Sequence, residues 1–193
     1  FSMANTPDQT QKLSFIIKKY PEGKFSGELD SGGIKAGAEV TVVGPYGTCF
    51  RRDERQGPLI LVGAGSGMSP IWSILNDHLK SGEKRPVYFF YGARTRNDLL
   101  YLDRSAELGG NHSDVTFIPV LSDALPEDRW SGRTGLVHQA VLDDFDDLSG
   151  YEVYACGAAA MTDLARKTFV EERGLPEDEF YCDAFTPSVD PRK

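Results

Sequence analysis

The sequence from residue 59 to residue 70, an apolar run followed by closely spaced glycines, reads Leu59-Ile60-Leu61-Val62-Gly63-Ala64-Gly65-Ser66-Gly67-Met68-Ser69-Pro70. A short, wholly apolar run bounded by glycines predicts a buried strand. Glycine admits positive φ and has no Cβ, so it lets an anion approach the backbone closely. Ser69 is a good N-cap and Pro70 suits the first helical position, which predicts a helix from there on. The stretch therefore predicts a strand, a tight turn and the N-terminus of a helix.

The glycine-rich turn has the features of a pyrophosphate-binding loop. A helix N-terminus offers unpaired N–H groups and the positive end of its dipole to an anion. The pattern departs from the GxGxxG fingerprint, whose third glycine would stand at Met68. The next predicted strand also runs into Gly92-Ala93-Arg94, with no carboxylate at its tip to bind a ribose. We therefore interpret the turn as a GxGxG variant of a dinucleotide site, with a turn that binds no ligand as the alternative.

Single residues exclude two other chemistries of glycine loops. A nucleophile elbow around Ser66, as in an α/β hydrolase, requires glycines where Ala64 and Met68 stand. A P-loop requires a lysine directly after its last glycine, and Met68 follows instead.

Composition predicts an ordinary acidic globular protein. The 193 residues are 40% hydrophobic and 26% charged, with a net charge of −8. No apolar stretch approaches the ~20 residues of a membrane span, and no signal peptide opens the chain, so we expect a cytoplasmic protein without membrane contact. The negative charge argues against nucleic acid as a partner. We interpret the acidic run at residues 143–147 as a solvated face, with a docking patch as the alternative.

The cysteines and histidines do not form a metal-binding pattern. Cys49, Cys156 and Cys182 are far apart in the sequence, and there is no CxxC motif or suitably spaced histidine. We therefore predict no zinc or iron–sulfur site in this chain and expect reduced thiols.

From residue 58 onward, strand-like and helical patterns alternate. The predicted strands are 58–63, 86–92, 115–121, 151–157 and 179–183, and the predicted helices are 69–79, 97–108, 136–145 and 161–172. This alternation predicts an α/β fold with a five-stranded parallel, doubly wound sheet. Ligands of such sheets bind beyond the carboxyl ends of the strands.

Residues 1–53 have a different character. β-rich runs at 13–20 and 39–43 are separated by turn residues, and no helical period is evident. We predict part of an antiparallel barrel or sandwich, with a boundary in the polar stretch 51–56. Two or three strands bury too little to be stable alone, so we expect the chain to begin inside a domain.

The order of the motifs carries a family resemblance. A β-rich segment precedes Gly63-Ala64-Gly65-Ser66-Gly67, then Gly92-Ala93-Arg94, then Cys156-Gly157 with Met161, then an aromatic C-terminal stretch. This order resembles the ferredoxin–NADP reductase superfamily and, within it, the NADH-dependent reductase components of bacterial multicomponent monooxygenases that act on phenol, propane or tetrahydrofuran. The resemblance implies the C-terminal portion of an antiparallel β-barrel FAD-binding domain at residues 1–55 and an NAD(H)-binding domain at 56–193.

The resemblance implies which residues bind FAD. Phe1 and Ser2 match the second half of the family's Arg-x-Tyr-Ser motif, with Phe1 in the place of tyrosine and Ser2 near the flavin N5. Phe185 resembles the aromatic residue that shields the flavin. The segment along the ribityl and adenosine parts corresponds to Ile16, Ile17 and Lys18, and the FAD pyrophosphate loop to Gly23, Lys24, Phe25 and Ser26.

The resemblance also implies an NADH site. The pyrophosphate would contact Gly63, Gly65, Ser66, Gly67 and Pro70, the adenosine end would contact Arg94, Ser122 and Asp123, and the nicotinamide would face Cys156 and Gly157, followed by Met161. The family often has prolines after Cys-Gly, where this chain has Ala158-Ala159. NADPH-dependent relatives tend to have arginine at the position of Asp123, whose charge would repel a 2′-phosphate, so we expect NADH.

The implied reaction is hydride transfer from NADH to FAD, followed by one-electron steps to a [2Fe-2S] centre and on to an oxygenase component as partner. Ser2, Cys156 and Phe185 are the expected catalytic residues. Nothing in this chain supplies the cluster ligands, so we expect them in another domain of a longer parent protein. The alternative is a nucleotide-binding fragment or regulatory module without flavin or catalysis. Cys49 is expected beside the flavin, where a buried free thiol is favoured over attachment to the ring.

Overall fold

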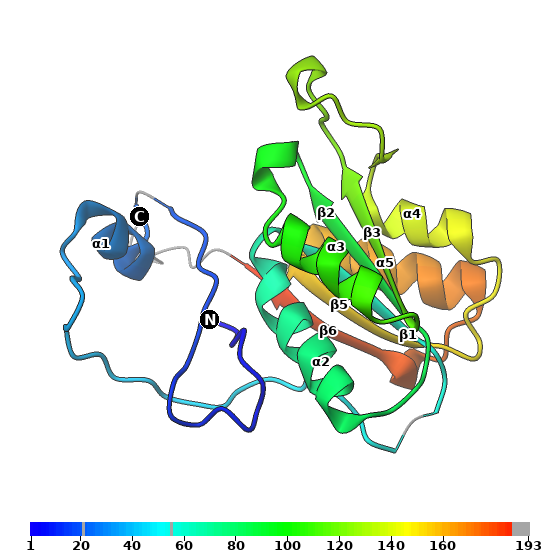
Figure 1. Ribbon diagram of the computed structural model, residues 1–193, viewed down its shortest axis with the longest axis horizontal. Coiled ribbons are helices and arrows are strands. Elements are labelled where there is room, and N and C mark those ends of the chain that lie inside the picture. Colours follow the sequence, from blue (N-terminus) through cyan, green and yellow to red (C-terminus); the bar gives the residue numbers. More distant parts are fainter. Residues whose placement is uncertain (21, 55, 187–193) are drawn as a thin grey trace.

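The centre of the molecule is a parallel β-sheet. The computed structural model describes residues 1–20, 22–54 and 56–186 (Figure 1). The strands are β1 (Leu59–Ala64), β2 (Val87–Ala93), β3 (Val115–Leu121), β4 (Arg133–Thr134), β5 (Glu152–Ala158) and β6 (Phe180–Phe185), in the spatial order β4-β3-β2-β1-β5-β6. All five predicted strands are present and parallel, which confirms the predicted fold class. The sixth strand, β4, has two residues and pairs with the end of β3, and it is too short to carry a sequence pattern.

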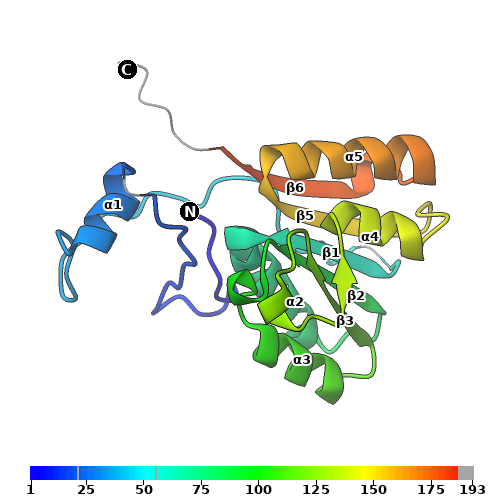
Figure 2. The same ribbon diagram turned by 90° about the horizontal axis from the view of Figure 1, so that it is seen from above.

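Helices cover both faces of this sheet. The helices are α1 (Lys24–Ser31), α2 (Met68–Ser81), α3 (Leu102–Asn111), α4 (Val137–Asp144) and α5 (Ala159–Arg173), with short 3₁₀ helices at Gly65–Gly67, Arg96–Asp98, Pro126–Asp128 and Glu177–Glu179. Figure 2 shows α2 and α3 on one face of the sheet and α4 and α5 on the other. The arrangement is therefore doubly wound, as predicted.

Alternate residues of each strand enter two separate cores. Leu59 and Leu61 of β1 pack with α2 on one face, while Ile60 and Val62 pack on the other face with α4 and α5. All four side chains are fully buried, and each such burial contributes about 1.5–3 kcal/mol. Burial on both faces explains why the strand reads as a continuous apolar run instead of an alternating one.

Two predicted helices differ in detail from those observed. Helix α2 begins at Met68 with Gly67 as its N-cap, so Ser69 is not the N-cap that the sequence suggested. The 3₁₀ turn at Gly65–Gly67 already starts the helical path. The predicted helix 97–108 is divided, because Tyr101 adopts a left-handed φ of 55° just before α3.

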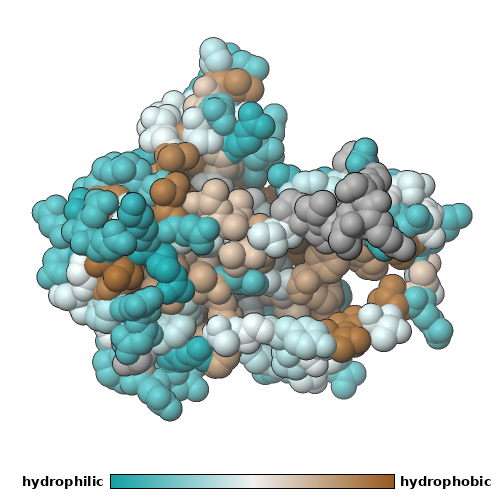
Figure 3. Space-filling model, turned by 180° about the vertical axis from the view of Figure 1, so that it is seen from behind, coloured by the Kyte–Doolittle hydropathy of each residue, from teal (hydrophilic) through white to brown (hydrophobic). Residues whose placement is uncertain are grey.

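Residues 1–54 lack the β-ladder that was predicted. Among the described residues of this segment, pairing is limited to one antiparallel bridge between Met3 and Phe15, and the runs 13–20 and 39–43 form no strand. An extended segment needs a neighbouring strand to pair its N–H and C=O groups. Val40, Val42 and Val43 are 56–68% exposed, and Figure 3 shows hydrophobic patches on this part of the molecule, at the right of the view. Helix α1 was not predicted. It shows no apolar period, and Ser26 is the only one of its residues that is buried.

Several polar contacts attach the N-terminal segment to α2. The Ser69 hydroxyl donates to the carbonyl of Ser2 (2.7 Å) and accepts from the N–H of Ile16 (3.3 Å). The Arg51 guanidinium contacts Asp77 at 2.8 Å and Glu83 at 2.9 Å. These contacts hold both ends of the segment against α2 and the residues that follow it. None of the helices in the described ranges is long and apolar enough to span a membrane.

Candidate functional site

The three glycines at the end of β1 and in the turn after it, Gly63, Gly65 and Gly67, have three different surroundings. Gly65 has a φ of +54°, and a Cβ at this position would meet nothing within 4 Å. Gly67 has an ordinary helical φ of −59°, but a Cβ there would lie 1.9 Å from the Cys156 carbonyl oxygen. At Gly63 a Cβ would lie 3.2 Å from the ring of Tyr91. Gly65 is thus required for its backbone conformation, whereas Gly67 lets the turn contact the end of β5.

The turn presents an open helix N-terminus. No side chain caps α2 or the 3₁₀ turn before it. The Met68 N–H donates to the carbonyls of Gly65 and Ser66, and Pro70 has no N–H, so a ligand at this end would contact the remaining N–H groups and the positive end of the helix dipole. The Tyr91 hydroxyl donates to the Gly65 carbonyl at 2.9 Å and so fixes the turn from β2. Burial raises the pKa of Tyr91, which keeps its hydroxyl protonated. Ser66 is half-buried, and Pro70 is fully buried within α2. Pro70 therefore packs the helix instead of facing the opening, whereas Gly65 and Ser66 border it.

Cys156 lies at the end of β5, directly against this turn. Its side chain is fully buried, and its sulfur is 3.5 Å from the sulfur of Cys49. The contact with Cys49, together with burial, raises the pKa of the Cys156 thiol. Gly157 has a φ of +156°, and a Cβ there would meet the Met161 methyl at 2.8 Å. The structure therefore brings together Cys156, Gly157 and Met161 as the sequence suggested, and adds Cys49, which is distant in sequence.

A carboxylate that the sequence analysis missed lies beside Cys156. The Ser2 hydroxyl donates a hydrogen bond to a carboxylate oxygen of Asp183. Asp183 pairs in register with Cys156 across β5 and β6. Asp183 and Phe185 are two residues apart on β6 and so share one face of the strand. Because Phe185 was assigned to the site, this two-residue spacing was a signal in the sequence that could have identified Asp183. Phe185 itself is partly buried at the end of the strand.

The residues predicted for the adenosine end meet at the ends of β2 and β3. The Arg94 Nε lies 3.2 Å from Asp123 Oδ2, and the Ser122 hydroxyl donates to the same oxygen at 3.1 Å. The N–H of Ser122 donates to the Ala93 carbonyl at 2.9 Å, which extends the pairing of β2 and β3 by one hydrogen bond. Arg94 is 81% exposed and Asp123 57% exposed, so both charged groups face solvent.

The predicted FAD residues form part of the N-terminal segment around α1. The rings of Phe1 and Phe25 are in contact, with centroids 5.4 Å apart. Gly23 is the N-cap of α1, and no side chain caps that helix, so its first N–H groups are open to an anion. Lys24 begins the helix with an exposed side chain. The Ser26 hydroxyl is buried and bonds both backbone groups of Tyr20 at 3.2 Å, so it holds the loop closed instead of facing a ligand.

The remaining predicted FAD contacts are divided by exposure. Ile16 and Ile17 are partly buried, and the backbone of Ile16 is held by Ser69. Lys18 is exposed, and its ammonium group lies 5.3 Å from the centre of the Tyr20 ring.

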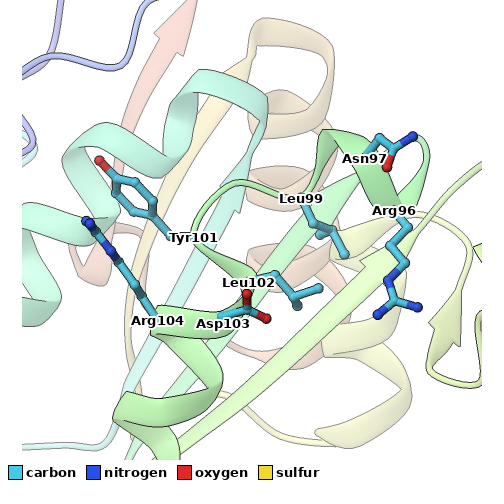
Figure 4. Close-up of a pocket in the computed structure, with 7 residues that line it drawn as sticks. All are labelled: Arg96, Asn97, Leu99, Tyr101, Leu102, Asp103 and Arg104. Atoms are coloured by element: carbon cyan, nitrogen blue, oxygen red, sulfur yellow. The ribbon is translucent and has the colours of Figure 1, made fainter.

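An open pocket of about 490 Å³ lies beside these sites, between the second 3₁₀ helix and α3. It is lined by Arg96, Asn97, Leu99, Tyr101, Leu102, Asp103 and Arg104 (Figure 4). Arg104 stacks over the Tyr101 ring at 5.0 Å, and Figure 4 shows this pair on one side of the pocket and Arg96 with Asn97 on the other. None of the predicted site residues lines the pocket. Over the described ranges, no group of three or more His, Cys, Asp or Glu side chains is arranged to hold a metal ion.

The observed geometry fits the two predicted nucleotides. The open space at Gly65 and the uncapped N-terminus of α2 suit a pyrophosphate. The exposed aromatic rings of Phe1 and Phe25, with the uncapped start of α1, suit a second nucleotide with a planar ring. The Cys156–Asp183 end of the sheet lies where these two surfaces approach each other, because Ser2 contacts Asp183.

Comparison with known proteins identifies two oxidoreductase families. Residues 61–167 match the oxidoreductase NAD-binding domain, and residues 1–50 match the oxidoreductase FAD-binding domain. The reductase component of propane 2-monooxygenase from Mycolicibacterium goodii is 40% identical over 193 residues, which cover 98% of this chain and 55% of that protein. A CDP-6-deoxy-L-threo-D-glycero-4-hexulose-3-dehydrase reductase from Yersinia pestis is 34% identical over 188 residues, covering 97% and 55%.

Solved structures agree with this assignment. The crystal structure of an Amycolatopsis cytochrome P450 reductase superposes with a TM-score of 0.88 at 30% identity, over 98% of this chain and 56% of that one. The chain spans about half the length of the curated relatives it matches.

Proposed function

Because this chain belongs to the oxidoreductase NAD-binding domain family and begins with a segment of the oxidoreductase FAD-binding domain, we propose that it carries the flavin- and NADH-binding part of the reductase component of an oxygenase system. The observation that carries the proposal is the meeting of three groups at one edge of the sheet. They are the uncapped glycine turn after β1, the Cys156 end of β5, and Ser2 bonded to Asp183.

The glycine turn would hold the NADH pyrophosphate. Gly65 and Ser66 border the opening, and the uncapped N-terminus of α2 would place the positive end of its dipole at the phosphate oxygens. Gly67 keeps the turn in contact with Cys156, so the position of the pyrophosphate sets the position of the nicotinamide relative to β5. Arg94, Ser122 and Asp123 would bind the adenosine end. Asp123 disfavours a 2′-phosphate by charge, which supports NADH over NADPH.

The residues of the chain would orient the two rings and exclude water. FAD, when bound, supplies a ring that accepts hydride and releases electrons singly. Cys156 offers the nicotinamide a small neutral thiol, since its pKa is raised. Ser2 would hold the reactive nitrogen of the flavin ring, and Asp183 orients the Ser2 hydroxyl. Phe185, partly buried at the end of β6, would cover the flavin until the nicotinamide displaces it.

The electron acceptor would lie outside this chain. Curated relatives are about twice as long, which leaves room for the domain that we expect to hold a [2Fe-2S] centre. The Mycolicibacterium goodii protein is named as a reductase component of a monooxygenase, which supports an oxygenase as the final partner. The Yersinia pestis relative is named as the reductase of a dehydrase, so the family serves other acceptors as well.

The test uses the full chain with added FAD. An anaerobic titration with NADH should bleach the flavin absorbance, and oxidation of NADH by ferricyanide should require FAD. Ser2→Ala and Cys156→Ala should each slow the bleaching about tenfold, which corresponds to ~1.4 kcal/mol in the barrier. Cys182→Ala is the control, because this thiol, on the next strand, contacts neither Cys49 nor Ser2 in any observed hydrogen bond.

The opposite result would favour the alternative function. A chain that binds NADH but remains colourless after incubation with FAD, and that oxidises no NADH, would be a nucleotide-binding module without flavin chemistry. The sparse pairing in the described part of residues 1–54 is the observation that favours this alternative.

A further inference from the structure

Two thiols from distant parts of the chain are in contact at the proposed nicotinamide site. Cys49 and Cys156 are separated by 107 residues, yet their sulfur atoms are 3.5 Å apart. Both are free cysteines. Metal binding does not explain this contact, since no third ligand accompanies the two thiols among the described residues. The proposed reductase chemistry uses Cys156 alone and leaves Cys49 without a role.

The segment that carries Cys49 is held in place on both sides. Arg52 donates to the Thr48 carbonyl at 2.9 Å, and its guanidinium stacks between the rings of Phe50 (3.6 Å) and Tyr181 (4.7 Å). Arg51 is fixed by its ion pair with Asp77 on α2 and by that with Glu83, just after this helix. Cys49 therefore stays close to Cys156, whose own position is set by the ladder between β5 and its neighbours.

The two thiols differ in access. Cys49 is half-buried between exposed neighbours, whereas Cys156 is fully buried. A disulfide requires the sulfur atoms to approach to about 2.05 Å, which is a closure of about 1.5 Å from the observed 3.5 Å. The partly exposed Cys49 sulfur is the one that a small oxidant can reach from solvent.

We propose that Cys49 and Cys156 form a peroxide-sensitive dithiol, a modification site that switches off the proposed hydride-transfer site. The Cys49 thiolate attacks one oxygen of a hydroperoxide; the O–O bond breaks, and the sulfur becomes a sulfenic acid while the other oxygen leaves as water or alcohol. The Cys156 sulfur then attacks the Cys49 sulfur, the S–O bond breaks, and water leaves with the thiol proton. The two sulfur atoms lose two electrons in total, and the peroxide gains them.

The disulfide changes the site in two ways. It removes the thiol that borders the nicotinamide, and it joins the segment containing residue 49 covalently to the end of β5. This second part of the inference rests on the proposed function. A displacement of about 1 Å at a reacting centre costs up to about a hundredfold in rate, so we expect NADH oxidation to fall at least about tenfold.

The test separates the chemistry from its effect on activity. The reduced full chain is treated with one equivalent of hydrogen peroxide, denatured and alkylated without reductant. We expect the mass to fall by two hydrogen atoms and one thiol, that of Cys182, to be alkylated in place of three. Peptide mapping should join residues 49 and 156. FAD-dependent oxidation of NADH by ferricyanide should fall with the same time course and return after treatment with dithiothreitol.

Two variants act as controls. Cys49→Ser should keep the activity of the reduced chain and should form no intramolecular disulfide, so peroxide should leave its NADH oxidation unchanged. Cys182→Ser should behave like the unaltered chain, because the Cys182 sulfur is near Arg166 (3.7 Å) and has no thiol in observed contact.

Three outcomes would overturn all or part of this inference. Oxidation to a sulfenic or sulfinic acid without a link between residues 49 and 156 contradicts the dithiol, as does a disulfide that includes Cys182. A disulfide of residues 49 and 156 that leaves NADH oxidation unchanged contradicts the switch. If the disulfide forms in a chain that never oxidises NADH, the modification stands and the proposed function fails.

Discussion

Replacing Gly67 by alanine tests whether the contact between the glycine turn and β5 is structural. A Cβ at residue 67 would lie 1.9 Å from the Cys156 carbonyl oxygen and 2.5 Å from its carbonyl carbon. Both are backbone atoms, so no side-chain rotation can relieve the clash. To reach an acceptable contact of at least 3.0 Å, the turn and the end of β5 must move apart.

This separation should reduce both stability and activity. Overpacking a rigid site costs about 1–3 kcal/mol, and a backbone clash belongs at the upper end. For a chain of this size, a loss of about 3 kcal/mol lowers the melting temperature by about 6–12 °C. The displaced end of β5 should lower FAD-dependent NADH oxidation by up to about a hundredfold.

The assays are thermal unfolding followed by circular dichroism and ferricyanide-linked NADH oxidation. Gly110→Ala is the matched control, because Gly110 lies in α3 and a Cβ there meets nothing within 4 Å. We expect that variant to be unchanged or more stable by up to about 1 kcal/mol. A Gly67→Ala variant that melts within about 2 °C of the unaltered chain would mean less than about 1 kcal/mol of strain, and the contact with β5 would then not be structural.

Three further changes test other parts of the structure. Asp123→Arg should improve kcat/KM for NADPH relative to NADH by at least tenfold, since a charge-assisted hydrogen bond to the 2′-phosphate contributes about 1.5–3 kcal/mol; an unchanged ratio would contradict the assigned adenosine end. Ser69→Ala removes two hydrogen bonds to the N-terminal segment and should lower the free energy of unfolding by about 1–2 kcal/mol, with faster hydrogen exchange in that segment; Ser81→Ala, at the other end of α2, should leave this exchange unchanged. Burial and the positive charge of Arg85 lower the pKa of His78 below its ordinary value of 6.5. As the pH falls below 6.5, His78 is therefore protonated in the unfolded chain before it is protonated in the folded one. The free energy of unfolding should decline in that range and should not change for this reason above it. Urea unfolding at pH 7.5 and 5.5 should show a smaller decline for His78→Gln than for the control His112→Gln, and equal declines would refute this assignment.

The parallel sheet could be predicted because each of its main strands is specified by residues that are consecutive in the sequence. The apolar run at 59–62 is buried on both faces, and a run of this kind identifies a central strand without knowledge of its neighbours. The glycine turn could be recognised for the same reason, because its glycines lie close together in the sequence, although Tyr91 and Cys156 also determine its position. The start of α2 was shifted by one residue, because the 3₁₀ turn at Gly65–Gly67 depends on hydrogen bonds that no residue type specifies.

The contacts across the site could not be predicted in this way. Cys49 and Cys156 are close because residues 48–52 are anchored to α2 and to Tyr181, far along the chain. The bond between Ser2 and Asp183 joins opposite ends of the described chain. In residues 13–20 and 39–43 the residue types favour strands, but strand formation also requires a neighbour to pair with, and the sequence pattern does not report whether one is present.

The first turn of α2 has a consequence for cooperativity. Its uncapped N-terminus faces the proposed pyrophosphate, while Ser69, in the same turn, binds the N-terminal segment through Ser2 and Ile16. A ligand that orders this turn therefore also lowers the entropic cost of attaching the segment, and attachment of the segment lowers the cost of binding the ligand. Such a coupling free energy is reciprocal. The affinity for NADH should thus rise when the flavin-binding segment is in place, and flavin should be retained more tightly by the NADH-bound protein.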